Sequence, residues 1–334
     1  MIKYNIGLIG NTYYDIILRL NTDHVIPGET QEVSEIHHKL GGVFNFLRAL
    51  ENDSNIYINL YTSFGDNRIQ ESKYEFAKNT RIITNNIEIQ KNKSTLESII
   101  TVDNTGTKTT FPYLCEQENR VKFYSNKELC LNKLVNADWY HIMYIDKLDL
   151  NIADIKKIRT SAKIISADLC SVKPSYKVLS KMEKLLGEID YLFLSEYEAE
   201  SFAGYLDHYN RIPNILNTNT IPIKDNHDFD NLIEQKTLYN ALMISAASSK
   251  AVCILHTPTY SFVVPANKNC RKLLYRAVYH NHQLKNINPI GAGDMCAANF
   301  IKLMLNKGKK YNMDKILLET HKLTSHLLKT NWTN

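Results

Sequence analysis

Glycine, proline and cysteine are all scarce in this chain, with 12, 8 and 6 copies among 334 residues. So little glycine and proline excludes collagen-like and low-complexity sequences, which are built from these residues. The cysteines are scattered, and none forms a CxxC pair or shows the spacing of metal ligands. They indicate reduced thiols, and because the chain opens without a secretory leader, we expect a cytoplasmic protein.

Long apolar runs and blocks of one charge are also missing. No run approaches the roughly 20 residues that span a bilayer, so we expect no membrane partner. The 40 basic and 35 acidic residues leave a formal charge of +5 and are spread along the chain, so nucleic-acid binding gets no support. What remains, 44% apolar and 22% charged residues, is the composition of a globular protein with a substantial core.

The middle of the chain alternates between the hydrophobic periods of strands and helices. We predict strands over 139–144, 164–169 and 191–194, and helices over 152–162, 176–186 and 196–202. Such alternation predicts βαβ units and an α/β fold, with a parallel sheet covered by helices. A helix over 232–247 and strands at 251–255 and 260–264 follow, and the polar segment 203–231 indicates a surface insertion.

The first third of the chain carries stronger β signals. β-branched residues cluster over 16–38 and again over 94–113, and in the second cluster Gly106 supplies the turn of a predicted hairpin. The pair Gly41 and Gly42 interrupts this pattern and opens a helix with one apolar face.

A short glycine motif lies near the end of the chain. Residues 288–294 read NPIGAGD, and an apolar helical run follows them. Gly291 and Gly293 permit a tight turn in which backbone N–H groups and the helix dipole face one anion, with Asp294 within reach of that anion. A plain loop whose Asp caps the helix is the alternative. The place of the motif after the last strand favours a ligand site.

Taken in order, these elements resemble the ribokinase-like (PfkB) family of carbohydrate and nucleoside kinases. The likeness lies in an early Asp, a Gly-Gly pair with a following Asn, a Gly-Asp after a strand, an Asn-x-x-Glu-like element and the Gly-Ala-Gly-Asp signature. The resemblance implies one α/β domain over 1–334, a three-layer sandwich with a mostly parallel central sheet. The segments at about 16–38 and 94–113 would form a small β lid, which often pairs two subunits, so a homodimer through the lid is one option.

The resemblance also assigns the residues at the reacting centre. Asp294 would be the general base, and Gly291, Ala292 and Gly293 would form the anion hole. The residues in contact with the substrate would come from the N-terminal part of the chain, and they are Asp15, Gly41, Gly42 and Asn45. An Asp can accept hydrogen bonds from sugar hydroxyls with both of its oxygens.

The nucleotide side departs further from the family pattern. Ser195 and Glu198 match the Asn-x-x-Glu element, so Glu198 could orient water on a magnesium ion, but the same spacing is also a capping box. The loop 254–259 lacks both glycines of the family, and its His256 either faces the nucleotide or is an ordinary satisfied or exposed histidine. Asp168 matches a position near the phosphates, with a plain strand-end Asp as the alternative.

Two further departures concern the cation and the substrate. Asn288 and Pro289 stand where the family has an acidic residue and a hydroxyl near a monovalent cation, so potassium activation is left open. Tyr13 stands where an Asn is frequent, and together with Tyr14 it could stack on a base.

The resemblance implies ATP- and Mg²⁺-dependent transfer of a phosphoryl group to a hydroxyl, expected to be a hydroxymethyl, of a sugar or sugar-like small molecule. A nucleoside kinase of the same family is the first alternative. A degenerate member that binds a sugar or nucleotide without catalysis is the second. A dinucleotide-binding oxidoreductase is excluded, because the first strand lacks a GxGxxG turn.

Overall fold

The structure is a computed structural model. It describes residues 3–24, 28–77, 81–113, 119–125, 127–170, 174–209, 232–248, 250–258, 260–265, 275–278, 288–307 and 312–330. Among the helices of these ranges, none combines the length and the hydropathy of a bilayer-spanning segment.

Ten strands form the main sheet, in the order β14-β13-β12-β11-β10-β9-β1-β4-β5, with β6 paired to β4. From β12 to β5 the neighbours are parallel, and only β13 and β14 run antiparallel to their partners. The mostly parallel sheet predicted from the sequence is therefore confirmed. The strands are β1 (Tyr4–Ile9), β4 (Ile56–Gly65), β5 (Ile82–Ile83), β6 (Ile87–Gln90), β9 (Ala137–Ile142), β10 (Ala162–Asp168), β11 (Tyr191–Ser195), β12 (Val252–His256), β13 (Tyr260–Val264) and β14 (Tyr275–Val278).

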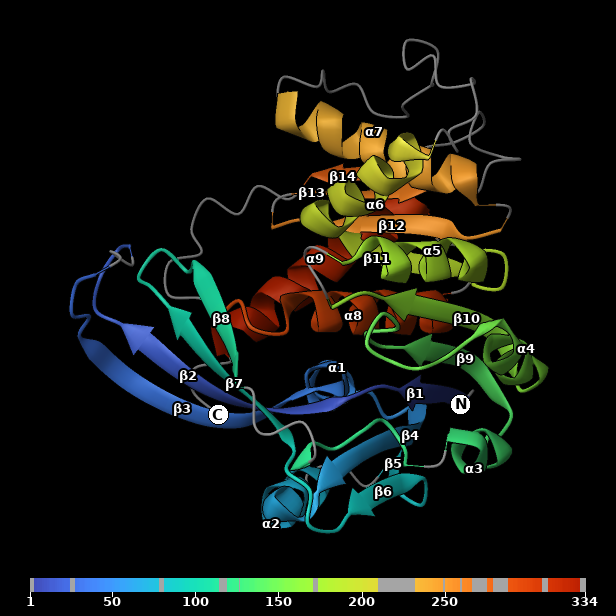
Figure 1. The fold of residues 1–334 in the computed structure, drawn as a ribbon. Coiled ribbons are helices and arrows are strands. Elements are labelled where there is room, and N and C mark those ends of the chain that lie inside the picture. The colour runs from blue at the N-terminus through green and yellow to red at the C-terminus, as the bar shows by residue number, and fades with distance from the viewer. Residues whose placement is uncertain are drawn as a thin grey trace.

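Helices cover both faces of the main sheet, which makes a three-layer sandwich (Figure 1). Successive strand side chains point to opposite faces. Trp139 and Phe193 therefore pack with α1, α8 and α9, whereas Tyr140 and Leu192 pack with α4 to α7. The helices are α1 (Val43–Leu50), α2 (Ile69–Ala77), α3 (Lys127–Asn132), α4 (Ile152–Thr160), α5 (Tyr176–Leu185), α6 (Glu196–His208), α7 (Leu232–Ala247), α8 (Ala292–Lys307) and α9 (Met313–Thr330), with a short 3-10 helix, Asp66–Arg68, before α2.

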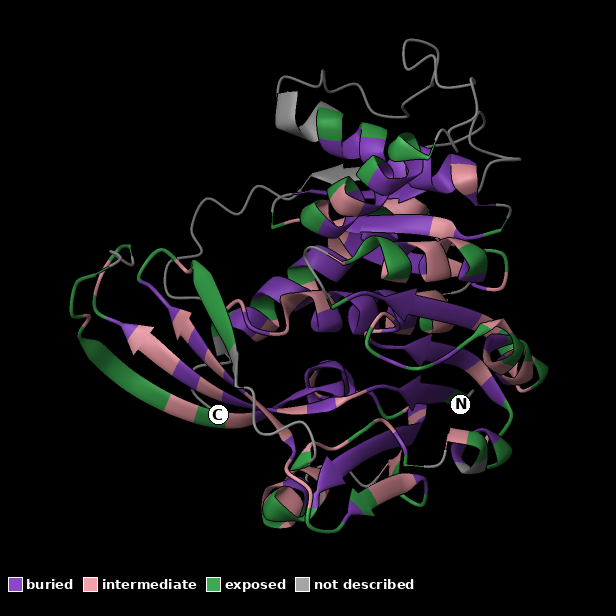
Figure 2. Ribbon diagram, in the orientation of Figure 1, coloured by how far each residue is buried: buried purple, intermediate pink, exposed green. Residues whose placement is uncertain are grey.

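A separate four-stranded sheet, the lid sheet, projects from the main body in the order β3-β2-β7-β8 (Figure 1). Its strands are β2 (Thr12–Leu20), β3 (Val33–Gly42), β7 (Leu96–Val102) and β8 (Lys108–Tyr113). The β7–β8 hairpin turns at Gly106, whose φ of 83° suits glycine. One face of the lid sheet packs Ile17, Ile100 and Val102 against Ile290, just before the glycine motif. The outer strand β3 is largely exposed along its first half (Figure 2).

Most boundaries differ from the predicted ones by one or two residues, and two differences bear on the site and the insertion. Strand β2 begins at Thr12, so Asp15 lies inside a lid strand and not ahead of it. Helix α6 continues to His208, so the first part of the predicted insertion 203–231 is helical, and residues 210–231 lie outside the described residues. Buried Phe202, Tyr205 and Leu206 explain the longer helix, because they extend its apolar face.

Candidate active site

The start of helix α8 depends on a glycine. Gly291 has φ 78°, and a Cβ there would lie 2.5 Å from Cγ of Asn45. Only glycine fits this conformation and this close approach without strain. At Gly293, a Cβ would lie 3.2 Å from Cε1 of His256, so this backbone also lies close to a neighbouring side chain.

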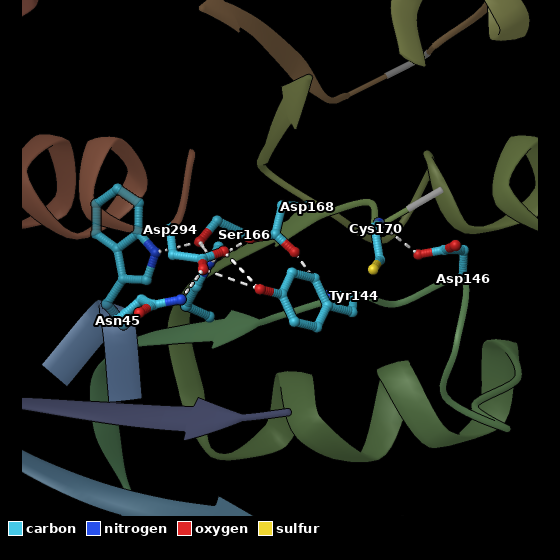
Figure 3. Close-up of polar contacts among 9 residues, drawn as sticks. Asn45, Tyr144, Asp146, Ser166, Asp168, Cys170 and Asp294 are labelled. Atoms are coloured by element: carbon cyan, nitrogen blue, oxygen red, sulfur yellow. Dashed lines mark hydrogen bonds and ion pairs between the residues drawn. The ribbon is translucent and has the colours of Figure 1, made fainter. Parts of the chain in front are cut away.

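Asp294 lies in the first turn of α8, which begins at Ala292. Its Oδ2 accepts a hydrogen bond from Nδ2 of Asn45 at 2.9 Å, and the Tyr144 hydroxyl is 2.9 Å from each carboxylate oxygen (Figure 3). These partners come from α1 and from the segment after β9. The carboxylate of Asp294 therefore contacts other elements of the main body.

The surroundings make Asp294 more basic than an ordinary Asp. Burial raises its pKa, and the negative charge of Asp168 raises it further. The hydrogen bonds from Asn45 and Tyr144 and the charge of Lys108 act in the opposite direction. A buried carboxylate with a raised pKa is suited to accept a proton near neutral pH.

A buried polar network lies behind Asp294. Asp168 accepts the backbone N–H of Tyr144 at 2.5 Å and lies 3.3 Å from Nε2 of His141. Ser166 Oγ is 2.8 Å from Nδ1 of His141 and accepts the indole N–H of Trp139 at 2.7 Å. Burial lowers the pKa of His141 to about 3, so the imidazole is neutral, and burial raises the pKa of Asp168. Asp168, the last residue of β10, thus holds the backbone of Tyr144, which has φ 56°.

On the lid side, Asp15 is held within its own sheet. Its Oδ1 accepts the Ser98 hydroxyl at 2.5 Å, and the strand register pairs Asp15 with both Ser98 and Lys39. A Cβ at Gly41 would lie 2.1 Å from Oδ2 of Asp15, so glycine is needed for this approach. Burial raises the pKa of Asp15, and the hydrogen bond from Ser98 opposes that shift.

The strand-to-helix junction after β3 positions Asn45. Gly42 has φ 64°, and a Cβ there would lie 2.3 Å from the carbonyl oxygen of Asn11. Helix α1 starts one residue later. Nη1 of Arg48 donates to Oδ1 of Asn45 at 3.0 Å, which leaves Nδ2 to point at Asp294. The predicted residues of the glycine pair, the following Asn and the C-terminal motif are thus brought together.

Ser195 and Glu198 form the capping box that was one of the two predictions for them. Glu198 Oε2 accepts the Ser195 N–H at 2.8 Å, and Ser195 Oγ accepts the Glu198 N–H at 3.4 Å. Burial raises the pKa of Glu198 to about 8, and the charges of Asp168 and Asp146 add to this. Asp146 follows β9, two strands along the sheet from β11, and accepts the Cys170 N–H at 2.8 Å (Figure 3).

His256 ends β12 beside Gly293, where the nucleotide loop was expected. Burial, and then the positive charges of His321 and Lys108, lower its pKa to about 4, so it is neutral near pH 7. The turn after it is bonded to itself, because Thr257 N–H donates to the Tyr260 carbonyl at 3.0 Å and Tyr260 N–H donates to Thr257 Oγ1 at 3.0 Å. These amides are therefore not free to bind phosphate.

Within the described ranges, no three His, Cys, Asp or Glu side chains gather as a metal site. Mg²⁺ keeps several waters and binds through one or two carboxylates and the phosphates of the substrate. The buried carboxyl of Glu198, near Asp168 and Asp146, fits such water-mediated binding.

The sequence did not single out four neighbours of the site: Lys39, Arg48, Ser98 and Tyr144. Arg48 follows Asn45 by one helical turn, and Tyr144 lies two residues past the end of a strand. The sequence alone therefore places both residues near predicted site elements. Their contacts could not be predicted, because they depend on where distant elements meet.

Comparison with known proteins places this geometry in a family. A family model for the pfkB family carbohydrate kinases matches residues 5–253, and its end lies before Gly291. No curated protein matches the chain closely enough in sequence to be reported as a relative.

Solved structures share the fold at low sequence identity. The ribokinase of Cryptococcus neoformans var. grubii serotype A, in complex with ADP, has a TM-score of 0.67 at 14% identity, over 98% of this chain and 94% of that one. A nucleoside kinase of Burkholderia thailandensis, in complex with inosine, has 0.64 at 10%, over 97% and 90%. A pyrophosphate-dependent kinase in the ribokinase family, with a pyrophosphate analogue and myo-inositol, has 0.59 at 15%, over 97% and 95%.

These structures share the α/β fold with its mostly parallel central sheet, and the family match covers well over half of the 334 residues. The chain therefore belongs to the pfkB family of carbohydrate kinases.

Proposed function

We propose that this kinase transfers the terminal phosphoryl group of ATP to a hydroxyl, expected to be a hydroxymethyl, of a sugar or sugar-like small molecule. One observation carries the proposal: the buried carboxylate of Asp294, at the start of α8, directly follows the glycine turn and is held by Asn45 and Tyr144. A base and an anion-binding backbone are thereby placed next to each other.

Asp294 would accept the proton of the attacking hydroxyl. A carboxylate has about four lone-pair positions. Asn45 occupies one, and the Tyr144 hydroxyl is shared between the two oxygens, so an acceptor O–H can still bind. The Tyr144 hydroxyl lies 2.9 Å from each oxygen of the Asp294 carboxylate. A substrate hydroxyl at a similar distance would be within reach for transfer of its proton to Asp294.

The anion hole would be the backbone of Gly291 to Asp294, in which the Ala292 N–H already donates to the Pro289 carbonyl at 3.2 Å. The first N–H groups of a helix lack partners inside the helix, and its dipole favours negative charge there. Charge that develops on the transferring phosphoryl group would be stabilised by these groups. Mg²⁺, when bound near Glu198 through water, would neutralise the phosphates of the donor. Ser195, Glu198 and His256 stay predictions for the nucleotide side.

The acceptor would lie against the lid sheet. Asp15 offers Oδ2, beside Gly41, to sugar hydroxyls, while Ser98 occupies Oδ1. Tyr13 shares the face of β2 that carries Asp15, and its ring lies 5.7 Å from that of Tyr144, so it could still stack on a nucleoside base. Tyr14 could not, because it lies on the other face of β2 with its ring under Arg68. Of these two tyrosines, only Tyr13 therefore supports a nucleoside as the acceptor.

Inorganic pyrophosphate is a second candidate donor. The turn from Thr257 to Tyr260 is bonded to itself and lacks the family glycines, so it offers little for a nucleotide. A pyrophosphate would need the anion hole but no base-binding loop. One of the structural neighbours is a pyrophosphate-dependent kinase.

The outer face of the lid sheet supports the homodimer option. Ile16, Ile99 and Phe111 are cross-strand neighbours on this face, and Phe111 and Ile36 are 53% and 59% exposed. An apolar sheet face of this kind is typical of an interface. Ile36→Lys should convert a dimer to a monomer in light scattering, and a wild-type protein that is already monomeric would contradict the homodimer.

The test of the function is phosphoryl transfer with a panel of sugars and nucleosides, using Mg-ATP or Mg-pyrophosphate as donor. Wild type is compared with Asp294→Asn and with the matched control Asp207→Asn, an exposed carboxylate on α6. We expect acceptor-dependent turnover in wild type and Asp207→Asn, and a loss of at least about a hundredfold in Asp294→Asn. If calorimetry shows a sugar or nucleotide binding while no acceptor stimulates either donor, the non-catalytic alternative replaces the kinase.

A further inference from the structure

Lys39 lies on β3 directly opposite Asp15 of β2, and Gly41 lies two residues further along the same strand. Directly opposed residues and residues two apart share one face of a sheet. Lys39 therefore faces the side of the lid sheet on which Asp15 and Gly41 would contact the acceptor.

The Lys39 ammonium is buried and has no hydrogen-bond partner among the residues that the structure describes. Arg68 and Arg159 also have a buried nitrogen without a partner, but both hold carboxylates through their outer nitrogens at 2.6 Å. Lys39 has no comparable ion pair in the described chain. A buried ammonium without a partner is costly, and such groups concentrate at functional sites.

Charged groups on four neighbouring elements act on Lys39. Burial lowers its pKa to about 8, and the positive charge of Arg48 on α1 acts in the same direction. Opposing charges come from Asp15 on β2, Glu75 on α2 and Asp294 on α8: three carboxylates that raise the pKa of Lys39 without bonding to its ammonium.

Two of these carboxylates contact other side chains instead of Lys39. Asp15 is bonded to Ser98, and Glu75 lies 3.7 Å from Arg48. Lys108 on β8 adds a further positive charge that acts on both Asp15 and Asp294. The acceptor side of the site therefore holds a buried cation that none of its neighbours neutralises by contact.

We propose that Lys39 binds an anionic group of the acceptor, a carboxylate or a phosphate, and that this kinase acts on a sugar acid or a sugar phosphate in preference to a neutral sugar. The proposal rests on the proposed phosphotransfer and names the class of its acceptor. A neutral hydroxyl would give the ammonium a hydrogen bond but would leave its charge uncompensated, whereas an anion supplies both.

The test compares three acceptors with the same carbon skeleton: the neutral sugar, its acid and its phosphate. Wild type is compared with Lys39→Met, Lys39→Arg and the control Lys73→Met, an exposed lysine of α2. We expect Lys39→Met to lower kcat/KM for the acid or the phosphate by about 30-fold, the size of a lost hydrogen bond between charged groups, and to change that for the neutral sugar by less than about threefold. The acceptor that shows the loss identifies the anion as carboxylate or phosphate.

The pH dependence adds a readout that a structural role would not move. In wild type, kcat/KM for the anionic acceptor should fall above about pH 8 as Lys39 loses its proton. In Lys39→Arg this fall should move to higher pH, because a guanidinium stays protonated. The thermal stability of Lys39→Met without substrate should match or exceed that of wild type, since the variant removes an unpaired buried charge.

Two outcomes would overturn the inference. One is an equal loss with neutral and anionic acceptors in Lys39→Met. The other is a preference of wild type for the neutral sugar. In both cases, turnover that is lost in Asp294→Asn would still support the proposed phosphotransfer, and only the role of Lys39 would fail. If no acceptor is phosphorylated, but the anionic one raises the melting temperature of wild type and not of Lys39→Met, the anion site holds and phosphotransfer fails.

Discussion

The two carboxylates of the site are held in different ways. Asp294 is fixed by Asn45 and Tyr144, which lie 249 and 150 residues away in the sequence and come from other parts of the main body. Asp15 is fixed by Ser98 inside the lid sheet, on a neighbouring strand. The proposed base is thus positioned by the packing of the whole sandwich, whereas the proposed substrate ligand belongs to a small sheet.

From this difference we expect the two carboxylates to affect different steps of the reaction. Changes around Asp294 should disturb the chemical step, because its partners set its basicity and direction. Changes around Asp15 should mainly disturb binding of the acceptor. The lid sheet contacts the main body where Ile17, Ile100 and Val102 pack against Ile290. The lid sheet and the main body are therefore joined by apolar contacts next to the glycine turn.

The largest effect is expected for Gly291→Ala. The added Cβ would lie 2.5 Å from Asn45 Cγ in a backbone with φ 78°, so we expect about 2 kcal/mol less stability and at least about a hundredfold lower kcat. Chemical denaturation and steady-state kinetics measure these. Gly204→Ala on α6 is the control, since its Cβ meets nothing within 4 Å and should stabilise the helix by about 0.5–1 kcal/mol. Equal behaviour of the two variants would contradict the role of the turn.

Asp15→Asn should come next. It keeps the shape of the side chain but removes the charge that accepts hydrogen bonds from the acceptor, so KM should rise by about 30-fold and kcat should change far less. Initial-rate kinetics with the best acceptor separate the two constants. A fall in kcat at unchanged KM would place Asp15 with Asp294 and would remove the proposed division between the lid sheet and the main body.

Tyr144→Phe should change the pH profile. The Tyr144 hydroxyl stabilises the ionised form of Asp294, so its loss should raise the pKa of that carboxyl. The base must be ionised, and the acid limb of kcat/KM should therefore move up by about one pH unit, with about tenfold lower activity below the limb. A profile that keeps its acid limb in place would show that this contact does not tune the base.

The smallest of these effects is expected for Ser98→Ala. Its hydroxyl donates to Asp15 at 2.5 Å, and the loss of one such bond should raise KM by about fivefold while the acid limb stays unchanged. Acceptor titrations at several pH values measure both. A shifted acid limb would mean that the lid sheet also tunes Asp294.

The sequence predicted the parts of the fold and site that depend on local rules. The glycine turn, the helix after Gly42 and the capping box at Ser195 each need a residue type at a fixed spacing, so they were visible without a structure. The alternating segments between residues 139 and 202 were visible because parallel strands and their covering helices have different periods. Helix α2 was not, since only scattered apolar residues mark it.

The contacts that tune the site could not be predicted in the same way. Lys39 lies in a strand whose first half is exposed, and its sequence gives no sign that the ammonium is buried. Tyr144 is one of 20 tyrosines, and its contact with Asp294 depends on how the end of β9 meets the start of α8. The capping box was one of two interpretations of Glu198, and the structure shows it, whereas the role of Glu198 toward magnesium stays a prediction.

The most direct test of the account is the pH dependence of kcat for wild type and Asp294→Asn with the best acceptor and donor. For wild type we predict a rate that rises with pH as the Asp294 carboxyl ionises, with an acid limb well above the usual range of an Asp. For Asp294→Asn we predict a rate at least about a hundredfold lower, with no such limb. Turnover at the wild-type level in Asp294→Asn, with the limb unchanged, would contradict the role of Asp294 as the base.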